Sequence, residues 1–180
     1  MVPIILVVLK RVKMIGPGKM GFTPSILFAI GCVSWFILGL FFAVFKRRST
    51  FDFQVKDTYF VIALIYVMIA VSVFLGMLGA IYHWFPKISG RYLNSAMSYI
   101  HFWVTFSGAY FIFWPSQYSG FSGLPMRYID YSNWGTFNQA GGLNQFVSMV
   151  AIAMLAAQFI FLFNLFYTIV NGRRVAAGNR

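Results

Sequence analysis

The chain has 180 residues, of which 60% are hydrophobic and only 9% are charged, and its mean hydropathy is +0.76. This composition is typical of an integral membrane protein and excludes an ordinary water-soluble domain. The formal net charge of +11 raises the alternative of a nucleic-acid-binding protein, but the basic residues lie in loops beside apolar runs. Topology and lipid headgroups explain them better, so we expect a lipid bilayer around the chain and no nucleic-acid partner.

Residues 1–22 are expected to form a basic segment that is amphipathic or extended. The apolar run from Pro3 to Leu9 is too short to cross a bilayer, which takes about 20 helical residues. A cleaved signal peptide is not expected, because this run precedes the basic residues that begin at Lys10, and no small-residue cleavage site follows.

Four later apolar stretches are long enough to cross a membrane as helices. Run length alone places them at residues 25–45, 59–84, 96–114 and 146–170. The loops between them leave no room for a soluble domain. We therefore predict an all-α membrane protein, with a four-helix transmembrane unit over residues 23–172 and a basic C-terminal tail at 173–180.

Charge asymmetry predicts the orientation of these spans. With four spans, both termini share a side with the loop at residues 86–95. Nine of the 14 basic residues fall on that side, so both termini are expected to face the matrix or the cytoplasm. The nine are Lys10, Arg11, Lys13, Lys19, Lys87, Arg91, Arg173, Arg174 and Arg180, and the other five are Lys46, Arg47, Arg48, Lys56 and Arg127.

Small and polar residues within the spans indicate that the helices pack against protein. Small residues recur every fourth position, which lets helices approach closely, at Ser72, Gly76 and Ala80 in the second span and at Ala153 and Ala157 in the fourth. Gln158 and Asn164 are expected to make interhelical hydrogen bonds, because an unpaired amide in lipid is costly. The single cysteine, Cys32, is expected to be a buried packing residue.

The titratable side chains offer little for catalysis. None of the three carboxylates, Asp52, Asp57 and Asp130, lies centrally in a span, so a proton relay built from acids is not supported. His83 and His101 flank one loop without a nearby carboxylate or cysteine. We interpret them as interfacial or structural histidines, since metal sites usually need three or four ligands.

Four segments resemble a known family. They are KDTYFVIALIYV at 56–67, HWFPKISGRYLN at 83–94, YIHFWVTFSG at 99–108 and FWPSQYSGFSGLPMRYIDY at 113–131. They are similar, in this order, to HDTYxVxAHFHYV, HWFPxxxGxxLN, KIHFW and FFPQHFLGLxGMPRRYxDY of haem-copper oxidase subunit I. The spacing fits without gaps from Asp52 to Tyr131, and the resemblance covers roughly the last four helices of that family. Residues 1–20 show no convincing counterpart.

The resemblance implies that the ligand positions of the family have changed. Its two axial haem histidines correspond to Leu64 and Tyr66; leucine has no lone pair, and Tyr66 is better explained as structural than as a phenolate ligand. Magnesium would fall at Lys56 and Asp57, and a lysine ammonium cannot replace a ligating imidazole.

The loop that follows the third span has changed in the same way. The propionate positions of the family correspond to Met126 and Arg127, and Arg127 is expected to form a loop salt bridge with Asp130. The resemblance thus implies no catalytic residue and no haem, copper or other metal on this chain. Haem and copper are expected only in partner subunits.

Three functions remain open. The first is a non-catalytic, subunit-I-like structural component of a respiratory terminal oxidase or of a larger respiratory assembly, whose partners are other oxidase subunits. The second is the C-terminal piece of a split catalytic subunit I, which predicts surviving ligands. The third is a stand-alone transporter or quinone-binding bundle, which predicts polar residues around a shared cavity. The phenylalanine-rich composition favours the mitochondrial inner membrane, with a bacterial or archaeal plasma membrane as the alternative.

Overall fold

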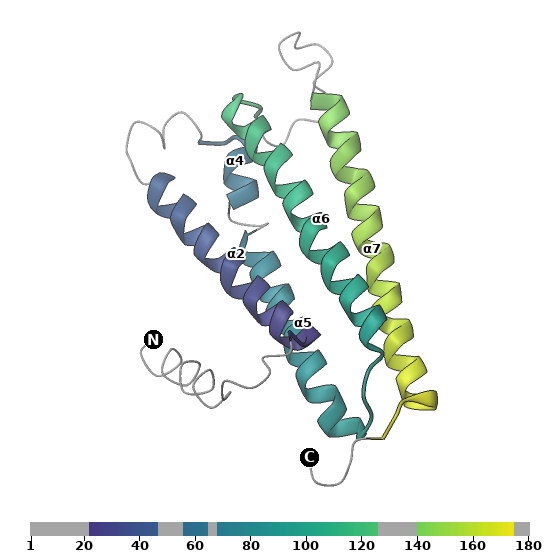
Figure 1. Cartoon of the computed structure of the whole chain (residues 1–180). Coiled ribbons are helices and arrows are strands. Elements are labelled where there is room, and N and C mark those ends of the chain that lie inside the picture. The colour runs from purple at the N-terminus through teal and green to yellow at the C-terminus, as the bar shows by residue number, and fades with distance from the viewer. Residues whose placement is uncertain (1–21, 47–55, 65–67, 126–139, 175–180) are drawn as a thin grey trace.

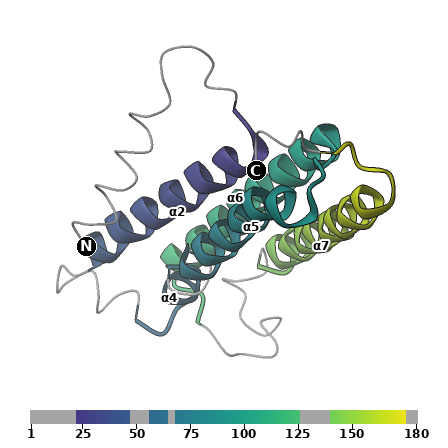
Figure 2. The same cartoon turned by 90° about the horizontal axis from the view of Figure 1, so that it is seen from below.

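The computed structural model describes residues 22–46, 56–64, 68–125 and 140–174. These residues form five helices: α2 (Pro24–Lys46), α4 (Tyr59–Ile62), α5 (Met68–Ser89), α6 (Ser95–Phe121) and α7 (Ala140–Asn171). The four long helices alternate in direction (Figure 1). Seen from below, α5 and α6 lie between α2 and α7 (Figure 2).

α2 packs closely on α5 because small residues line their interface. A Cβ added to Gly79 would lie 3.2 Å from Phe28 Cβ, and one added to Gly76 would lie 3.1 Å from Cys32 Sγ. Ser72 is buried on the same face, whereas Ala80 is exposed. The close-packed face of α5 therefore runs through Ser72, Gly76 and Gly79, and the predicted third member, Ala80, lies outside it.

Aromatic side chains fill the space between α2, α5 and α6. Phe28 stacks on Tyr82 at a centroid distance of 5.2 Å and meets the edge of Phe102 at 5.0 Å. Further along α2, the buried Trp35 contacts Phe113 edge to face at 5.5 Å. Such pairs add to the energy of burying apolar area, so α6 is held at the centre of the described bundle.

Short pairings between distant segments close both ends of the bundle. One end, which we call the Thr58 end, comprises residues 56–60 and 119–125. There, Tyr59 N–H donates to the Leu124 carbonyl at 3.1 Å. At the other, the Arg91 end (residues 22–25, 86–95 and 171–174), Tyr92 N–H donates to the Arg173 carbonyl at 2.9 Å. Gly90, with a φ of 65°, permits the turn that ends α5, since this backbone region is strained for other residues.

Three described helical segments are long and apolar enough to cross a membrane: Pro24–Val44, Met68–Ser89 and Gly141–Asn171. Between 11% and 33% of each apolar window is buried within the chain, so most of their surface faces outward. The chain is an all-α membrane protein.

Three predicted spans differ from the helices observed, and the one at 146–170 lies within α7, which begins six residues earlier. The predicted span at 59–84 is divided between α4 and α5, with residues 65–67 outside the described residues, and α5 continues to Ser89. The predicted span at 96–114 lies within α6, which is long enough but less apolar than the other long helices because it carries buried polar residues.

Candidate functional site

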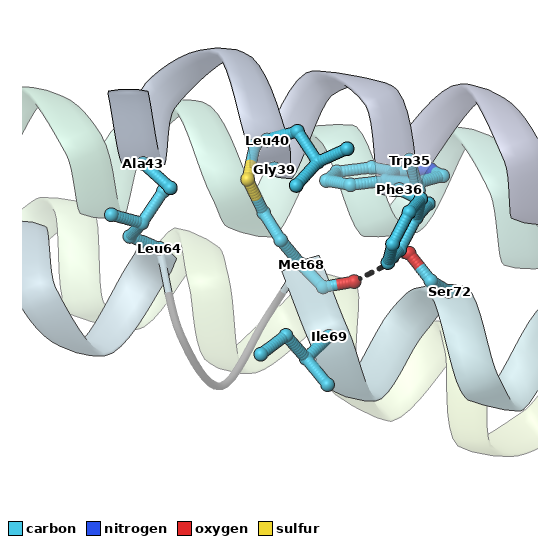
Figure 3. A pocket seen from close by; sticks show the side chains of 9 residues that line it. All are labelled: Trp35, Phe36, Gly39, Leu40, Ala43, Leu64, Met68, Ile69 and Ser72. Carbon is cyan, nitrogen blue, oxygen red and sulfur yellow. Dashed lines mark hydrogen bonds between the residues drawn. The ribbon is translucent and has the colours of Figure 1, made fainter. Parts of the chain in front are cut away.

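Leu64, at one of the two family haem-ligand positions, is a buried residue in the turn that follows α4. It borders a cavity of about 160 Å³ between α2 and α5 (Figure 3). The lining comprises Trp35, Phe36, Gly39, Leu40, Ala43, Leu64, Met68, Ile69 and Ser72. The other ligand position, Tyr66, lies outside the described residues.

The atoms around this cavity do not fit a haem. Ser72 Oγ–H donates to the Met68 carbonyl at 2.7 Å, and the buried Trp35 Nε1 is a donor only, without a hydrogen-bond partner. In the described lining, only the Met68 thioether could ligate iron. In cytochromes c, methionine ligates haem iron together with a histidine, and no histidine lines this cavity.

The family magnesium positions lie at the Thr58 end. Lys56 and Asp57 are both exposed, and Asp57 adopts a left-handed backbone with a φ of 62°. Thr58 follows and caps α4, its Oγ1 accepting from Phe60 N–H at 3.3 Å. No group of three His, Cys, Asp or Glu side chains lies together in the described ranges. Met126, Arg127 and Asp130 lie outside the described residues.

The main polar cluster of the described structure is centred on His101, which is fully buried in α6. Its Nε2–H donates to Gln158 Oε1 on α7 at 3.1 Å, so its Nδ1 accepts from the Tyr82 hydroxyl on α5 at 3.0 Å when the ring is neutral. Gln158 Nε2 donates in turn to Thr105 Oγ1 at 3.3 Å. One imidazole therefore joins three helices.

A second polar contact joins α6 to α7 at the Arg91 end. The fully buried Asn164 accepts from Asn94 N–H through Oδ1 at 3.1 Å. Its Nδ2 donates to the Asn94 carbonyl at 3.1 Å and to Ser98 Oγ at 3.0 Å. Both polar residues of the fourth predicted span, Gln158 and Asn164, thus make interhelical hydrogen bonds.

The two histidines occupy different environments. His83 is exposed on α5, where Lys87 Nζ donates to its Nε2 at 2.9 Å, whereas His101 lies inside the bundle. Sequence reasoning placed His101 at the end of a span and missed its partner Tyr82. The two residues are 19 positions apart on different helices, so no local pattern connects them.

The polar cluster around His101 links α5, α6 and α7 by hydrogen bonds. Its donors find acceptors within the chain, which is the usual state of polar groups buried between helices. Gln117 on α6 differs, because it is buried and neither atom of its amide has a hydrogen-bond partner among the described residues. Sequence reasoning did not single it out.

The chain is similar to known oxidase subunits. The model of the family described as "Cytochrome C and Quinol oxidase polypeptide I" matches residues 1–154, which includes the N-terminal segment where the sequence motifs showed no counterpart. The chain is 39% identical over 156 residues to the alternative cytochrome c oxidase subunit 1 of Bradyrhizobium diazoefficiens, covering 86% of this chain and 26% of that protein.

Two further relatives are also cytochrome c oxidase subunit 1 proteins by name. Identity is 32% over 163 residues with cytochrome c oxidase subunit 1 of Cereibacter sphaeroides, covering 90% of this chain and 28% of that protein. Identity is 35% over 114 residues with a probable cytochrome c oxidase subunit 1-beta of Nocardia farcinica, covering 63% of this chain and 19% of that protein. The chain spans between 19% and 28% of the length of these relatives.

Proposed function

Because the chain belongs to the cytochrome c and quinol oxidase polypeptide I family, we propose that it is a subunit-I-like component of a terminal oxidase that holds no haem itself. Family membership supports the terminal-oxidase role. The non-catalytic part of the proposal rests on the chemistry of the ligand position.

Leu64 carries this proposal. Its side chain cannot donate an electron pair to iron, and it packs beside a cavity that is lined mainly by apolar side chains. No imidazole lines the cavity, and His101, the nearest buried histidine in sequence, is held by Tyr82 and Gln158. We therefore propose that haem and copper of the assembly reside in partner subunits.

We also propose that α6 is the fourth membrane span. Its 27 residues extend about 40 Å at 1.5 Å per residue, enough to cross the apolar part of a bilayer. Its most polar buried residues, among them His101 and Gln117, are shielded from lipid by neighbouring helices. A span shielded in this way tolerates a lower hydropathy than one that faces lipid.

Other oxidase subunits are the proposed partners. α7 exposes a long series of large apolar side chains, including Phe159, Leu162 and Phe166. These faces suit either lipid or a neighbouring membrane protein. The test described next also separates this proposal from the split-subunit alternative.

Native purification tests the proposal. The tagged full chain is solubilised from its own membrane in mild detergent, and the native complex is assayed for oxidase activity and haem. We expect comigration with haem-containing activity and a copurifying complete subunit I. The isolated chain is expected to show no haem absorbance.

Each alternative predicts a different result. A stoichiometric haem band in the isolated chain would overturn the ligand argument. A copurifying subunit I that lacks its own last helices would favour the split subunit. Migration as a lone bundle would favour the transporter or quinone-binding alternative.

Fractionation of the source cells tests location. The composition favours the mitochondrial inner membrane, while the three relatives named above are bacterial and fit a plasma membrane. In either membrane we propose that both termini face the matrix or cytoplasm, which protease protection of terminal tags checks.

A further inference from the structure

We propose that a cavity at the Arg91 end of the bundle binds the headgroup of an anionic phospholipid. The cavity has a volume of about 360 Å³, within the range of small-molecule sites, and lies between the start of α2, the last turns of α5 and the start of α6. This proposal is independent of any oxidase function.

The polar part of the lining suits a phosphate. Lys87 supplies a positive charge, and hydroxyl groups come from Thr23, Ser25 and Ser95 on two other segments. Lys87 Nζ donates to His83 Nε2 at 2.9 Å, and the described lining of the cavity contains no carboxylate to neutralise the ammonium. An ammonium among hydroxyl donors is a suitable arrangement for a phosphate monoanion.

The surrounding charge also favours an anion. Arg91, Arg173 and Arg174 lie at the same end of the bundle, and the three acidic residues of the sequence are at positions 52, 57 and 130. None of these acids falls within the segments that form the Arg91 end. Charges near a membrane surface attract anionic lipid by about 1 kcal/mol for each Lys or Arg.

Aromatic residues place the cavity at headgroup depth, which identifies a lipid as the source of the phosphate. Trp84 is 61% exposed, and its ring lies 5.8 Å from Lys87 Nζ. Tyr92, in the cavity lining, is also exposed. Exposed Trp and Tyr concentrate at the interface between bilayer and water. Apolar lining from Pro86 and Leu93 suits the glycerol and first methylenes of the lipid.

Lipid titration of the full chain tests this site. The protein in neutral detergent is titrated with short-chain phosphatidylglycerol or phosphatidylcholine, and bound lipid is counted by native mass spectrometry. Four proteins are compared: wild type, K87Q, the charge-preserving K87R, and K56Q. Lys56 is the matched control because it is an exposed lysine at the opposite end.

We expect preferential binding of one phosphatidylglycerol, weakened about fivefold by K87Q, which corresponds to the loss of one surface charge. K87R and K56Q are expected to bind like wild type. Equal binding by K87Q, equal retention of phosphatidylcholine, or no retained lipid overturns the proposal. Binding of inorganic phosphate to the wild type at least as tightly as phosphatidylglycerol would identify free phosphate as the ligand and overturn the lipid assignment.

Discussion

Asn164 and Asn94 form a reciprocal pair in which a side-chain amide bonds both main-chain groups of one residue. Asn164 Oδ1 accepts from Asn94 N–H, and Asn164 Nδ2 donates to the Asn94 carbonyl, each at 3.1 Å. The Asn94 side chain meanwhile caps α6 by accepting from Met97 N–H at 3.3 Å. One residue therefore both starts α6 and attaches it to α7.

Replacement of Asn164 by leucine is expected to destabilise the chain by about 1–2 kcal/mol, because Asn94 N–H and the buried Ser98 Oγ lose their bonds to the Asn164 amide, while the Asn94 carbonyl keeps its bonds from Ser98. Unfolding of the purified protein in mixed micelles measures the change. N144L is the matched control, since Asn144 lies on the same helix with an exposed side chain. A loss for N164L no larger than that for N144L would refute the role of this pair.

The His101–Gln158 contact predicts a positive coupling energy. Q158L removes the acceptor of the imidazole N–H, and we expect a loss of about 1–2 kcal/mol in unfolding free energy. In a double-mutant cycle with H101L, the combined loss should fall short of the sum by about 0.6–1.7 kcal/mol, as for other hydrogen bonds between membrane helices. Q145L, at an exposed glutamine of α7, is the control. Strict additivity would contradict the contact.

Gly120 is expected to tolerate no side chain. A Cβ there would lie 2.5 Å from Phe60 Cα and 2.6 Å from Phe60 Cβ, so G120A forces α4 away from α6. We expect a loss of about 3 kcal/mol, at the upper end of overpacking effects. The control is G142A, because nothing lies within 4 Å of that position and alanine is the better helix former. Thermal unfolding followed by circular dichroism compares the two variants, and equal stability would contradict the close contact.

Restoring a histidine at position 64 is not expected to restore haem binding. L64H supplies one imidazole, but the lining of the adjoining cavity offers no second histidine and no charged side chain to hold a haem. The variant should also lose about 1–3 kcal/mol of stability, because its imidazole would be buried without a partner. Optical spectra after growth with added haem precursor provide the measurement, with L64M as an apolar control. A low-spin haem band in L64H alone would show that the site has retained its shape.

Sequence reasoning located several features because they depend on local chemistry. The first span, at 25–45, agrees with α2 within a residue at each end, since a continuous apolar run directly reflects helix length. Interhelical bonding by Gln158 and Asn164 follows from the cost of an unpaired amide in lipid. The resemblance to the family rested on four ungapped motifs, and the family comparison confirmed it.

The features that the sequence did not predict depend on the angular position of a residue around its helix and on tertiary contacts. A helix advances about 100° per residue, so eight residues bring Ala80 about 80° away from Ser72, whereas Gly79 stays within about 20° of it. The four-residue spacing was therefore too coarse to select the packed face. The pairing of Thr58 with Pro125, which fixes the start of α4, joins residues 67 positions apart and leaves no local mark in the sequence.

The pairing of Tyr92 with Arg173 has a consequence for how the protein is made. Arg91 Nη1 donates to the Val170 carbonyl at 2.8 Å, and Tyr92 N–H donates to the Arg173 carbonyl at 2.9 Å. The α5–α6 hairpin must therefore emerge from the ribosome and enter the bilayer with these donors facing interfacial water. Only the arrival of the last helix, some 80 residues later in synthesis, completes the turn, so final docking of the hairpin is a late step of biogenesis.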